Sequence, residues 1–323
     1  MKMVPLRGTD WKLSAISLGM ADIGVGIDVP EAERMLDAYL DMGGNLLDTA
    51  RVYSDWIPGE MGRGERLLGE WIRRRGGTRG FYLATKGAHP RLNSMHTPRM
   101  SPAEITGDLE LSLRALGVEA IDLYYLHRDD RGREVEEILD TLEGCVKAGK
   151  IRAYACSNWQ ADRMEEAHAC AARHGWQGFA GNQVFWSLGS HNSRGLSDDT
   201  CVACDPTLRQ AFERTGITTV AYTSQANGFF SKLAQSDPRA AQGGRAIYDT
   251  AGNRRVYEAA RAVCDQTGRT MTEVALSYLI SQPHPTIAVV GCKSEAQLHE
   301  SMAAAQCDLS AHQLAALERA IYA

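Results

Sequence analysis

Hydrophobic positions fall into two kinds of segment that alternate from residue 16 onward. One kind is a short, continuous apolar run, typical of a strand buried on both faces. The other is longer and has apolar residues at helical spacing, which predicts an amphipathic helix. The predicted strands are Ile16–Leu18, Asn45–Leu47, Phe81–Thr85, Ile121–Leu126, Ile151–Cys156, Gly178–Val184, Ile217–Tyr222 and Thr286–Val290. The predicted helices are Pro30–Met42, Gly62–Arg75, Ser101–Leu116, Arg133–Ala148, Gln160–His174, Pro206–Thr215, Asn253–Ser281, Glu295–Ala305 and Ser310–Tyr322.

Residues suited to helix ends stand at the boundaries of these segments. Ser101 precedes Pro102 and is followed three residues later by Glu104, the pattern of a capping box. Glycine, which favours the left-handed conformation that ends many helices, follows five of the segments. These glycines are Gly43, Gly117, Gly149, Gly175 and Gly216.

The order of the elements predicts the fold class. Eight strands, each followed by a helix, specify a parallel sheet, and no linker or change of composition divides the chain. We therefore predict an α/β protein, a single (β/α)8 TIM barrel over residues 1–323 with an extra C-terminal helix. Ser187–Asp205 and Asn227–Gly252 are polar or glycine-rich and longer than most connections, and we expect them to be active-site loops.

The charge and hydropathy of the chain argue against nucleic acid or a membrane as its partner. The net charge is −5, and the one dense basic run, Arg73–Arg75, ends a predicted helix, where it complements the helix dipole. Met1–Ser14 lacks a secretory signal, and no apolar run approaches the roughly 18 residues of a membrane span. We expect a cytoplasmic protein that acts on small molecules rather than on nucleic acid or a membrane. No feature of the sequence indicates an oligomeric state.

The eight cysteines are scattered, which is typical of reduced thiols rather than of a disulfide framework. Cys201 and Cys204 form a C-x-x-C pair with His191 ten residues upstream. A zinc or redox site would need further ligands or a thioredoxin-like context, and we expect no metal there.

Polar or ionisable residues stand at the C-terminal ends of seven successive predicted strands. In a barrel these ends meet on one rim, where catalytic residues collect, and packing alone does not explain so many polar positions. Alone, each residue also has a structural interpretation, such as an ion pair or a hydrogen-bonded core side chain. The residues are Asp48, Lys86, His127, Ser157, Gln183, Tyr222 and Lys293, with Tyr53 five positions after Asp48.

Five segments carry a resemblance to the aldo-keto reductase superfamily. Gly43–Tyr53, with the sequence GGNLLDTARVY, resembles the family's signature around its catalytic Asp and Tyr. The other four, in family order, are Ala84–Lys86, Tyr125–His127, Gly149–Arg152 and Ser157–Asn158. The resemblance runs from about Leu6 to Leu317. It implies an NADP(H)-dependent oxidoreductase that reduces an aldehyde or ketone to the alcohol, with Asp48, Tyr53, Lys86 and His127 as catalytic tetrad.

Elementary chemistry agrees with these roles. Carbonyl reduction needs a hydride at carbon and a proton at oxygen, and a phenol with a pKa near 10 is a poor donor at neutral pH. We expect the Lys86 ammonium to lower the pKa of Tyr53, and Asp48 to keep Lys86 charged and in position. His127 could orient the carbonyl or shuttle the proton.

The resemblance also implies a nicotinamide site. Ser157, Asn158 and Gln183 would bind the carboxamide, and Tyr222 would stack on the ring. No G-x-G-x-x-G motif follows a strand, so a Rossmann site is not supported. Lys293 and Ser294, before a predicted helix, favour NADP(H) over NAD(H), although Lys293 taken alone would be interpreted as a solvated lysine at a helix start. The predicted cofactor-binding residues are Gly19, Met20, Asp48, Ser157, Asn158, Gln183, Tyr222, Thr223, Gln225, Gly228, Gly291, Lys293, Ser294, Gln297, Glu300 and Ser301.

Three positions depart from the family pattern. Ser301 stands where Asn is common, Gln225 where Leu or Gly is frequent, and Arg128–Asp130 where many members have Trp-Pro. Arg128 could face the substrate and favour a sugar, a keto-sugar or an anion, or it could pair with Asp129 or Asp130. Trp56 and Trp186 could form a substrate platform or be packing residues. The candidate substrate residues are Asp22, Trp56, His89, Arg128, Phe185 and Trp186.

Two other function classes compete with a reductase. A regulatory or redox-sensing subunit of the same fold would bind the nicotinamide cofactor with little turnover. A barrel hydrolase or isomerase using Asp and His would leave Ser157, Asn158, Gln183 and Tyr222 unexplained.

Overall fold

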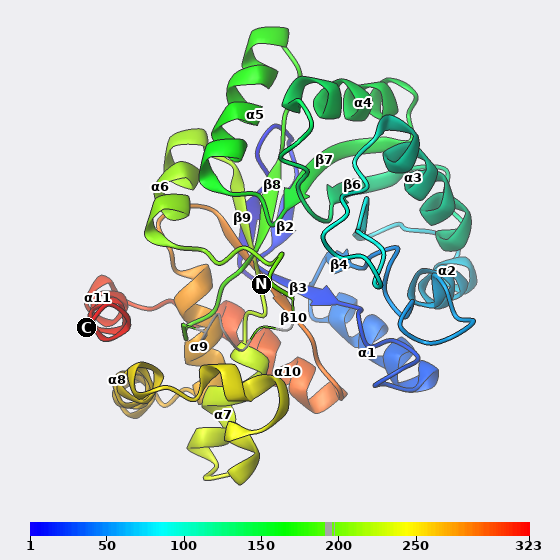
Figure 1. Ribbon diagram of the computed structural model, residues 1–323. Coiled ribbons are helices and arrows are strands. Elements are labelled where there is room, and N and C mark those ends of the chain that lie inside the picture. Colours follow the sequence, from blue (N-terminus) through cyan, green and yellow to red (C-terminus); the bar gives the residue numbers. More distant parts are fainter. Residues whose placement is uncertain (191–195, 197) are drawn as a thin grey trace.

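Eight parallel strands close into a barrel with helices around it (Figure 1). The computed structural model describes residues 1–190, 196 and 198–323. Neighbouring strands pair in the order β10-β3-β4-β5-β6-β7-β8-β9, with β9 returning to β10. The strands are β3 (Ile16–Gly19), β4 (Leu46–Asp48), β5 (Tyr82–Gly87), β6 (Ile121–Leu126), β7 (Ile151–Ser157), β8 (Gly181–Phe185), β9 (Thr218–Tyr222) and β10 (Thr286–Val290). The predicted (β/α)8 barrel is therefore confirmed.

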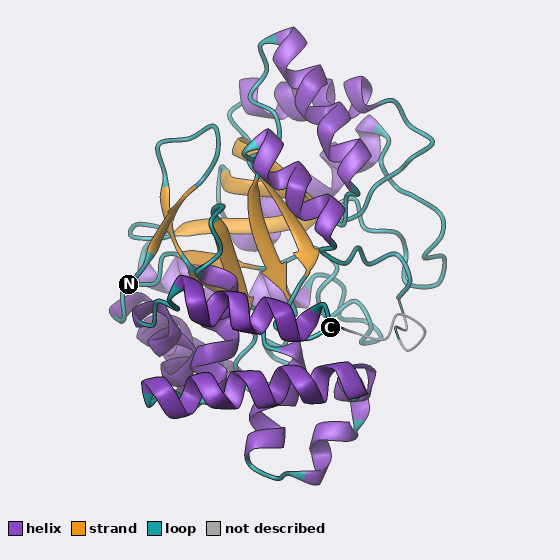
Figure 2. Ribbon diagram, turned by 90° about the vertical axis from the view of Figure 1, so that its left-hand side faces the viewer, coloured by secondary structure: helices purple, strands orange, loops and turns teal. Residues whose placement is uncertain are grey.

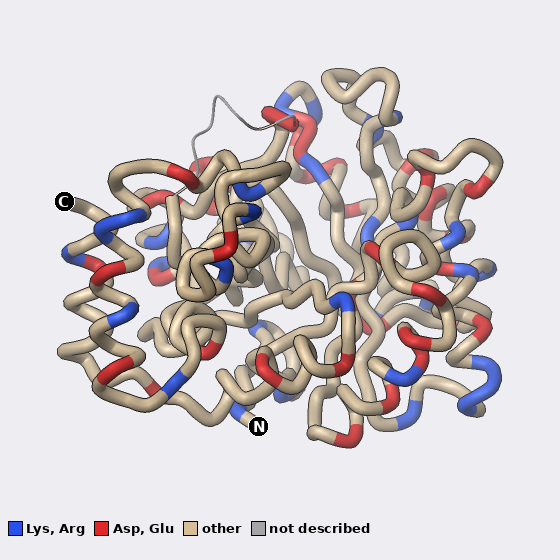
Figure 3. The backbone as a smooth tube through the Cα atoms, turned by 90° about the horizontal axis from the view of Figure 1, so that it is seen from below, with Lys and Arg blue, Asp and Glu red and all other residues tan. Residues whose placement is uncertain are grey.

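The helices run outside the barrel and enclose the strands, with long loops beyond one end (Figure 2). Those between and after the strands are α1 (Val29–Asp41), α2 (Arg63–Arg75), α3 (Pro102–Leu116), α4 (Val135–Lys147), α5 (Ala161–His174), α6 (Pro206–Thr215), α8 (Ala251–Thr267), α9 (Met271–Ile280), α10 (Glu295–Ala303) and α11 (Ala311–Ile321). None of the described helices is long and apolar enough to cross a membrane. Basic and acidic residues are interspersed along the chain in the view of Figure 3.

The predicted helix ends are present. Ser101 and Glu104 form the capping box at the start of α3. All five glycines expected at helix ends have positive φ, between 64° and 82°. The segment Asn253–Ser281, however, was predicted as one helix and is two, α8 and α9. Gly268, at φ 68°, ends the first, and Thr270 caps the second with Glu273.

Two further elements have no counterpart in the predicted pattern. An antiparallel hairpin, β1 (Met3–Pro5) and β2 (Lys12–Ser14), precedes the barrel. Its turn residue Arg7 donates to the carbonyl oxygens of Phe179 and Thr215, which lie just before β8 and β9, so the hairpin lies at the N-terminal end of the barrel.

The segment 227–252, expected to be a loop, folds largely into short helices. These are η2 (Ala226–Gly228), α7 (Phe229–Ala234), η3 (Pro238–Ala241) and η4 (Gly243–Tyr248). Buried Phe229, Phe230 and Tyr248 anchor it to the core. Part of the other predicted loop, 187–205, lies outside the described residues.

Helices α2 and α3 approach closely at Gly69, where a Cβ atom would lie 2.3 Å from the Ala115 carbonyl oxygen. We expect Gly69→Ala to lower the free energy of unfolding by about 1–3 kcal/mol, because backbone must move to admit the methyl group. Gly107→Ala on α3, where a Cβ would meet nothing within 4 Å, should instead stabilise by about 0.5–1 kcal/mol. Urea unfolding of both variants is the measurement. Equal stability of the two variants would contradict this account of the packing.

A buried carboxyl group lies between the barrel and α2. Glu65 is fully buried, accepts a 2.6 Å hydrogen bond from Thr85, and burial raises its pKa to about 7. Since this exceeds the ordinary value of 4.5, the folded protein holds the proton more tightly than the unfolded chain. This group's contribution to stability is therefore complete below pH 4.5 and is lost as the pH rises to 7.

Glu65→Gln should remove that pH dependence. The free energy of unfolding of the variant relative to wild type should rise by about 2.5 kcal/mol between pH 5 and pH 8. Urea unfolding at both pH values measures it, with exposed Glu70→Gln on the same helix as control. A difference between variant and wild type that is the same at both pH values would show that Glu65 is already ionised when buried.

Candidate active site

A cavity of about 1230 Å³ opens at the C-terminal ends of the barrel strands. Its walls come from residues at or after the ends of these strands and from the short helices of 227–252. Of the residues predicted for catalysis, cofactor or substrate, the cavity is lined by Gly19, Asp22, Asp48, Tyr53, Trp56, His89, His127, Arg128, Ser157, Asn158, Gln183, Tyr222, Thr223, Gln225, Gly228, Gly291, Lys293, Gln297 and Glu300. The structure thus brings most of the predicted site together around one space.

Lys86 lies behind the cavity wall and is fully buried. Its Nζ donates to Asp48 Oδ1 at 2.5 Å, to the Thr49 carbonyl oxygen at 2.9 Å and to the Tyr53 hydroxyl at 3.2 Å. Burial alone would lower the pKa of Lys86, but the Asp48 carboxylate and Tyr53 outweigh it, so the pKa lies above its ordinary value. The ammonium is therefore held charged beside the phenol.

Tyr53 does not show the lowered pKa expected from the sequence. Burial raises the pKa of its hydroxyl, Lys86 acts in the opposite direction, and the Asp48 carboxylate adds to the rise. The result lies above the ordinary value. The expectation left out the burial of the Tyr53 hydroxyl, which is the largest effect, and the Asp48 carboxylate then offsets part of the effect of Lys86.

His127 faces Tyr53 and a second histidine. Its ring meets the Tyr53 ring edge-on at 6.1 Å between centroids and the His89 ring at 4.6 Å. Burial, with Arg128 and His89 nearby, holds the pKa of His127 well below its usual range, so the ring is neutral. Its Nδ1 is buried and has no partner among the described residues.

The residues predicted to bind the nicotinamide carboxamide are hydrogen-bonded to one another and to the tetrad. Gln183 donates to Asp48 Oδ2 at 2.9 Å, and Ser157 donates to the Gln183 carbonyl oxygen at 2.8 Å. Asn158, at φ 62°, accepts from the Tyr222 hydroxyl at 2.5 Å and from the Val202 amide at 2.9 Å. The opposite wall is therefore fixed relative to Asp48 and Lys86.

Three predicted cofactor residues do not line the cavity. Met20 is buried, and its amide donates to the Asp48 carbonyl oxygen. Ser294 caps α10 by accepting from the Gln297 amide. Ser301 is fully buried, accepts from the Gln225 side chain at 2.9 Å and donates to the Gln297 carbonyl oxygen at 2.8 Å. These three support the wall from behind rather than form it.

Arg128 lines the cavity but is engaged with protein. Its Nη2 donates to Asp198 at 2.6 Å, its Nε to Thr200 at 2.7 Å and its Nη1 to the His127 carbonyl oxygen at 2.8 Å. The alternative pairing with Asp129 or Asp130 is wrong, because Asp129 pairs with Arg163 and Asp130 with Arg133. Arg128 instead ties the segment after β8 to the end of β6.

Phe185 and Trp186, two of the candidate substrate residues, do not line the cavity. Trp186 is parallel to His284 at 6.0 Å and meets Tyr278 edge-on at 6.1 Å, so it is a packing residue between strand and helices. Phe185 meets the Tyr222 ring edge-on at 5.5 Å. Trp56 does line the cavity and is 49% exposed.

Several lining residues were not predicted. Ile27, Val52, Leu92 and Met95 add apolar surface beside Tyr53 and Trp56, and Lys232, Arg239 and Arg245 add positive charge along 227–252. The only signal for any of them was their place in segments that follow strand ends. Neither an irregular loop nor a helix of one or two turns, such as those of 227–252, is long enough for a period to assign a side chain to a face.

Comparisons with known proteins agree with this geometry. The family described as "Aldo/keto reductase family" matches residues 15–321. The "Uncharacterized oxidoreductase YrpG" of Bacillus subtilis (strain 168) is 27% identical over 96% of this chain and 92% of its own. The "Aryl-alcohol dehydrogenase [NADP(+)]" of Phanerodontia chrysosporium is 25% identical over 94% and 80%. The "Probable voltage-gated potassium channel subunit beta" of Arabidopsis thaliana is 25% identical over 91% and 88%.

Proposed function

This chain belongs to the aldo/keto reductase family, and on that premise we propose that it is an NADP(H)-dependent oxidoreductase that reduces an aldehyde or ketone to the alcohol. The observation that carries the proposal is the contact of Lys86 Nζ with both Asp48, at 2.5 Å, and the Tyr53 hydroxyl, at 3.2 Å, at the wall of a large cavity. A phenol beside a buried ammonium, open to a substrate-sized space, is a proton donor for a carbonyl oxygen.

Each member of the tetrad has a distinct task in this reaction. Tyr53 donates its proton to the carbonyl oxygen, and Lys86 stabilises the phenolate that remains. Asp48 keeps Lys86 charged, since an unpaired buried ammonium would be costly. Neutral His127 orients the carbonyl by hydrogen bonding rather than by acting as an acid, because its pKa is held far below neutral.

The residues present fit a nicotinamide cofactor. Asn158 and Gln183 are amides at the cavity wall and Tyr222 is an aromatic beside them, a donor and acceptor set suited to a carboxamide and its ring. Bound NADPH would supply the hydride. Lys232, Arg239, Arg245 and Lys293 bring positive charge to the same cavity, which favours a phosphate-rich dinucleotide and supports NADP(H) over NAD(H).

Tyr53→Phe tests the proton donor. The variant keeps the ring but loses the hydroxyl, so we expect carbonyl reduction to fall by about 100-fold or more while NADPH binds as in wild type. Steady-state NADPH oxidation measures the rate of carbonyl reduction, and fluorescence titration measures the affinity for NADPH. Tyr82→Phe, whose ring stacks on Trp11 at 4.8 Å and does not line the cavity, is the matched control and should retain full activity.

Wild-type turnover in Tyr53→Phe would remove Tyr53 from the mechanism. A wild-type protein that binds NADPH tightly but reduces none of a broad set of aldehydes would instead favour a regulatory subunit. The similarity to a channel subunit is the observation that supports this alternative.

The substrate end of the cavity favours an apolar carbonyl compound over a sugar. Apart from Tyr53, five large apolar side chains in the segments after β3, β4 and β5 line the cavity, against two polar ones, Asp22 and His89; the five are Ile27, Val52, Trp56, Leu92 and Met95. Arg128, which suggested a polyhydroxylated or anionic ligand, has all three guanidinium nitrogens donating to protein. We therefore propose an aromatic aldehyde as the substrate class, a choice that the name of the aryl-alcohol relative also supports.

Trp56→Ala tests this choice. The exposed indole would supply the apolar face for an aromatic ring, so its loss should raise KM for a benzaldehyde about tenfold and leave KM for a short aliphatic aldehyde nearly unchanged. Steady-state kinetics with both aldehydes and with an aldose measures it. An aldose turned over with a higher kcat/KM than the benzaldehyde would contradict the proposed substrate class.

A further inference from the structure

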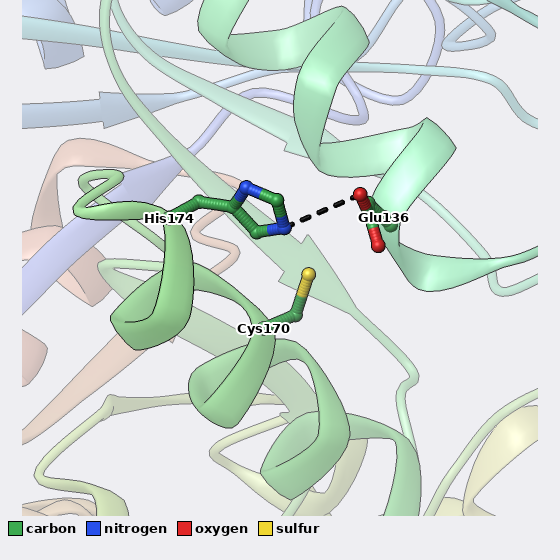
Figure 4. Close-up of side chains that lie close together, drawn as sticks. All are labelled: Glu136, Cys170 and His174. Carbon is green, nitrogen blue, oxygen red and sulfur yellow. Dashed lines mark ion pairs between the residues drawn. The ribbon is translucent and has the colours of Figure 1, made fainter.

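A second group of chemistry-bearing side chains lies on the outside of the barrel, apart from the residues that line the cavity. Glu136 of α4 and Cys170 and His174 of α5 converge there (Figure 4). We propose that these three residues bind a divalent transition-metal cation of the zinc class, which links α4 to α5.

Helix geometry explains why the three side chains meet. Cys170 and His174 are four residues apart on α5, so they share one face of the helix. Glu136 stands in the first turn of α4, which packs against α5. His174 Nε2 lies 3.2 Å from Glu136 Oε1, and Figure 4 shows Cys170 Sγ directed into the same space. One ligand atom from each residue lies within 4.8 Å of the others.

These distances suit a tetrahedral cation. With bonds of about 2.0–2.3 Å, neighbouring ligand atoms of a zinc site are about 3.5 Å apart. The His174–Glu136 pair is already at that spacing, and the thiol needs only a side-chain adjustment to reach it. Sulfur, imidazole nitrogen and carboxylate oxygen are together the donor set that zinc accepts, and water would complete the fourth position.

The surroundings hold two of the ligands in place. The His174 ring stacks on Trp176 at 4.2 Å between centroids, which restricts its orientation. Cys170 is 1% exposed, whereas the side chains of Glu136 and His174 are 60% and 35% exposed, so a cation could enter from solvent and reach the thiol behind them. A surface ion pair between His174 and Glu136 alone would contribute little to stability, and it would not account for the Cys170 thiol that is directed at it.

Binding would couple two helices that are separated along the chain by β7. The thiol would release its proton to solvent as the sulfur–metal bond forms, leaving a thiolate ligand. Because the three ligands converge only in the folded protein, the cation would stabilise the fold in proportion to its concentration.

Cadmium is the probe that tests the site, because a thiolate bound to cadmium has a charge-transfer absorption in the ultraviolet. Titration of the full chain, reduced and freed of metal by chelation, should show this band saturating at one equivalent, with zinc displacing the cadmium. Cys170→Ser should abolish the band, and His174→Ala and Glu136→Gln should weaken binding by about tenfold or more. The last two change exposed side chains, so loss of folding does not obscure the result.

Cys264→Ser, which removes a partly buried thiol from α8, is the matched control and should leave the titration unchanged. Zinc should also raise the melting temperature of wild type but not of Cys170→Ser. A cadmium band that persists in Cys170→Ser, or that disappears only when Cys201 and Cys204 are both replaced by serine, would overturn the proposal. Equal affinity in wild type and His174→Ala would do so as well.

Discussion

The buried ion pair between Lys86 and Asp48 is the constraint on which the arrangement at the C-terminal ends of the barrel strands depends. A fully buried ammonium is tolerated only when its charge and its donors are satisfied, and Asp48, Thr49 and Tyr53 together satisfy them. The pair lies on adjacent strands, β4 and β5, and Gln183 of β8 binds the second oxygen of Asp48 from across the barrel. The register of β4 and β5, with Asp48 opposite Ala84, therefore brings the two charges together, and closure of the barrel adds Gln183.

The same pair influences the electrostatics of the two groups that we propose act on the carbonyl oxygen, Tyr53 and His127. Tyr53 is buried enough that its pKa is raised, and the Lys86 ammonium offsets part of that rise at a distance that only this backbone arrangement maintains. His127 is neutral because it is buried beside Arg128 and close to Lys86. A phenol that can donate its proton and an imidazole that stays neutral therefore lie side by side.

The parts of the structure that could be predicted from sequence are those with a regular hydrophobic pattern. Buried strands have such a pattern, and it marks where each strand ends. The barrel and the positions of Asp48, Lys86, His127 and Gln183 could therefore be predicted. For Trp186 the sequence left a substrate platform and a packing role open. The packing role is right, because side chains alternate along a strand and Trp186 points to the opposite side from Gln183, toward the helices. Leu92 and Met95 lie in an irregular segment and Arg245 in the short helix η4, and the side-chain directions in such segments depend on contacts far away in the chain. Glu136 lies 34 residues before Cys170, so nothing local pointed to their meeting.

The hydrogen bond between Gln225 and Ser301 explains two departures from the family pattern at once. Gln225 stands where Leu or Gly is frequent and Ser301 where Asn is common, yet here the two side chains are partners at 2.9 Å. Replacing Gln225 by Leu alone would remove the donor from a fully buried hydroxyl, and a larger amide at 301 would enter space that is already filled. The two positions are therefore structurally coupled, so that a change at one alone would leave a buried polar group without its partner or overfill the space beside it.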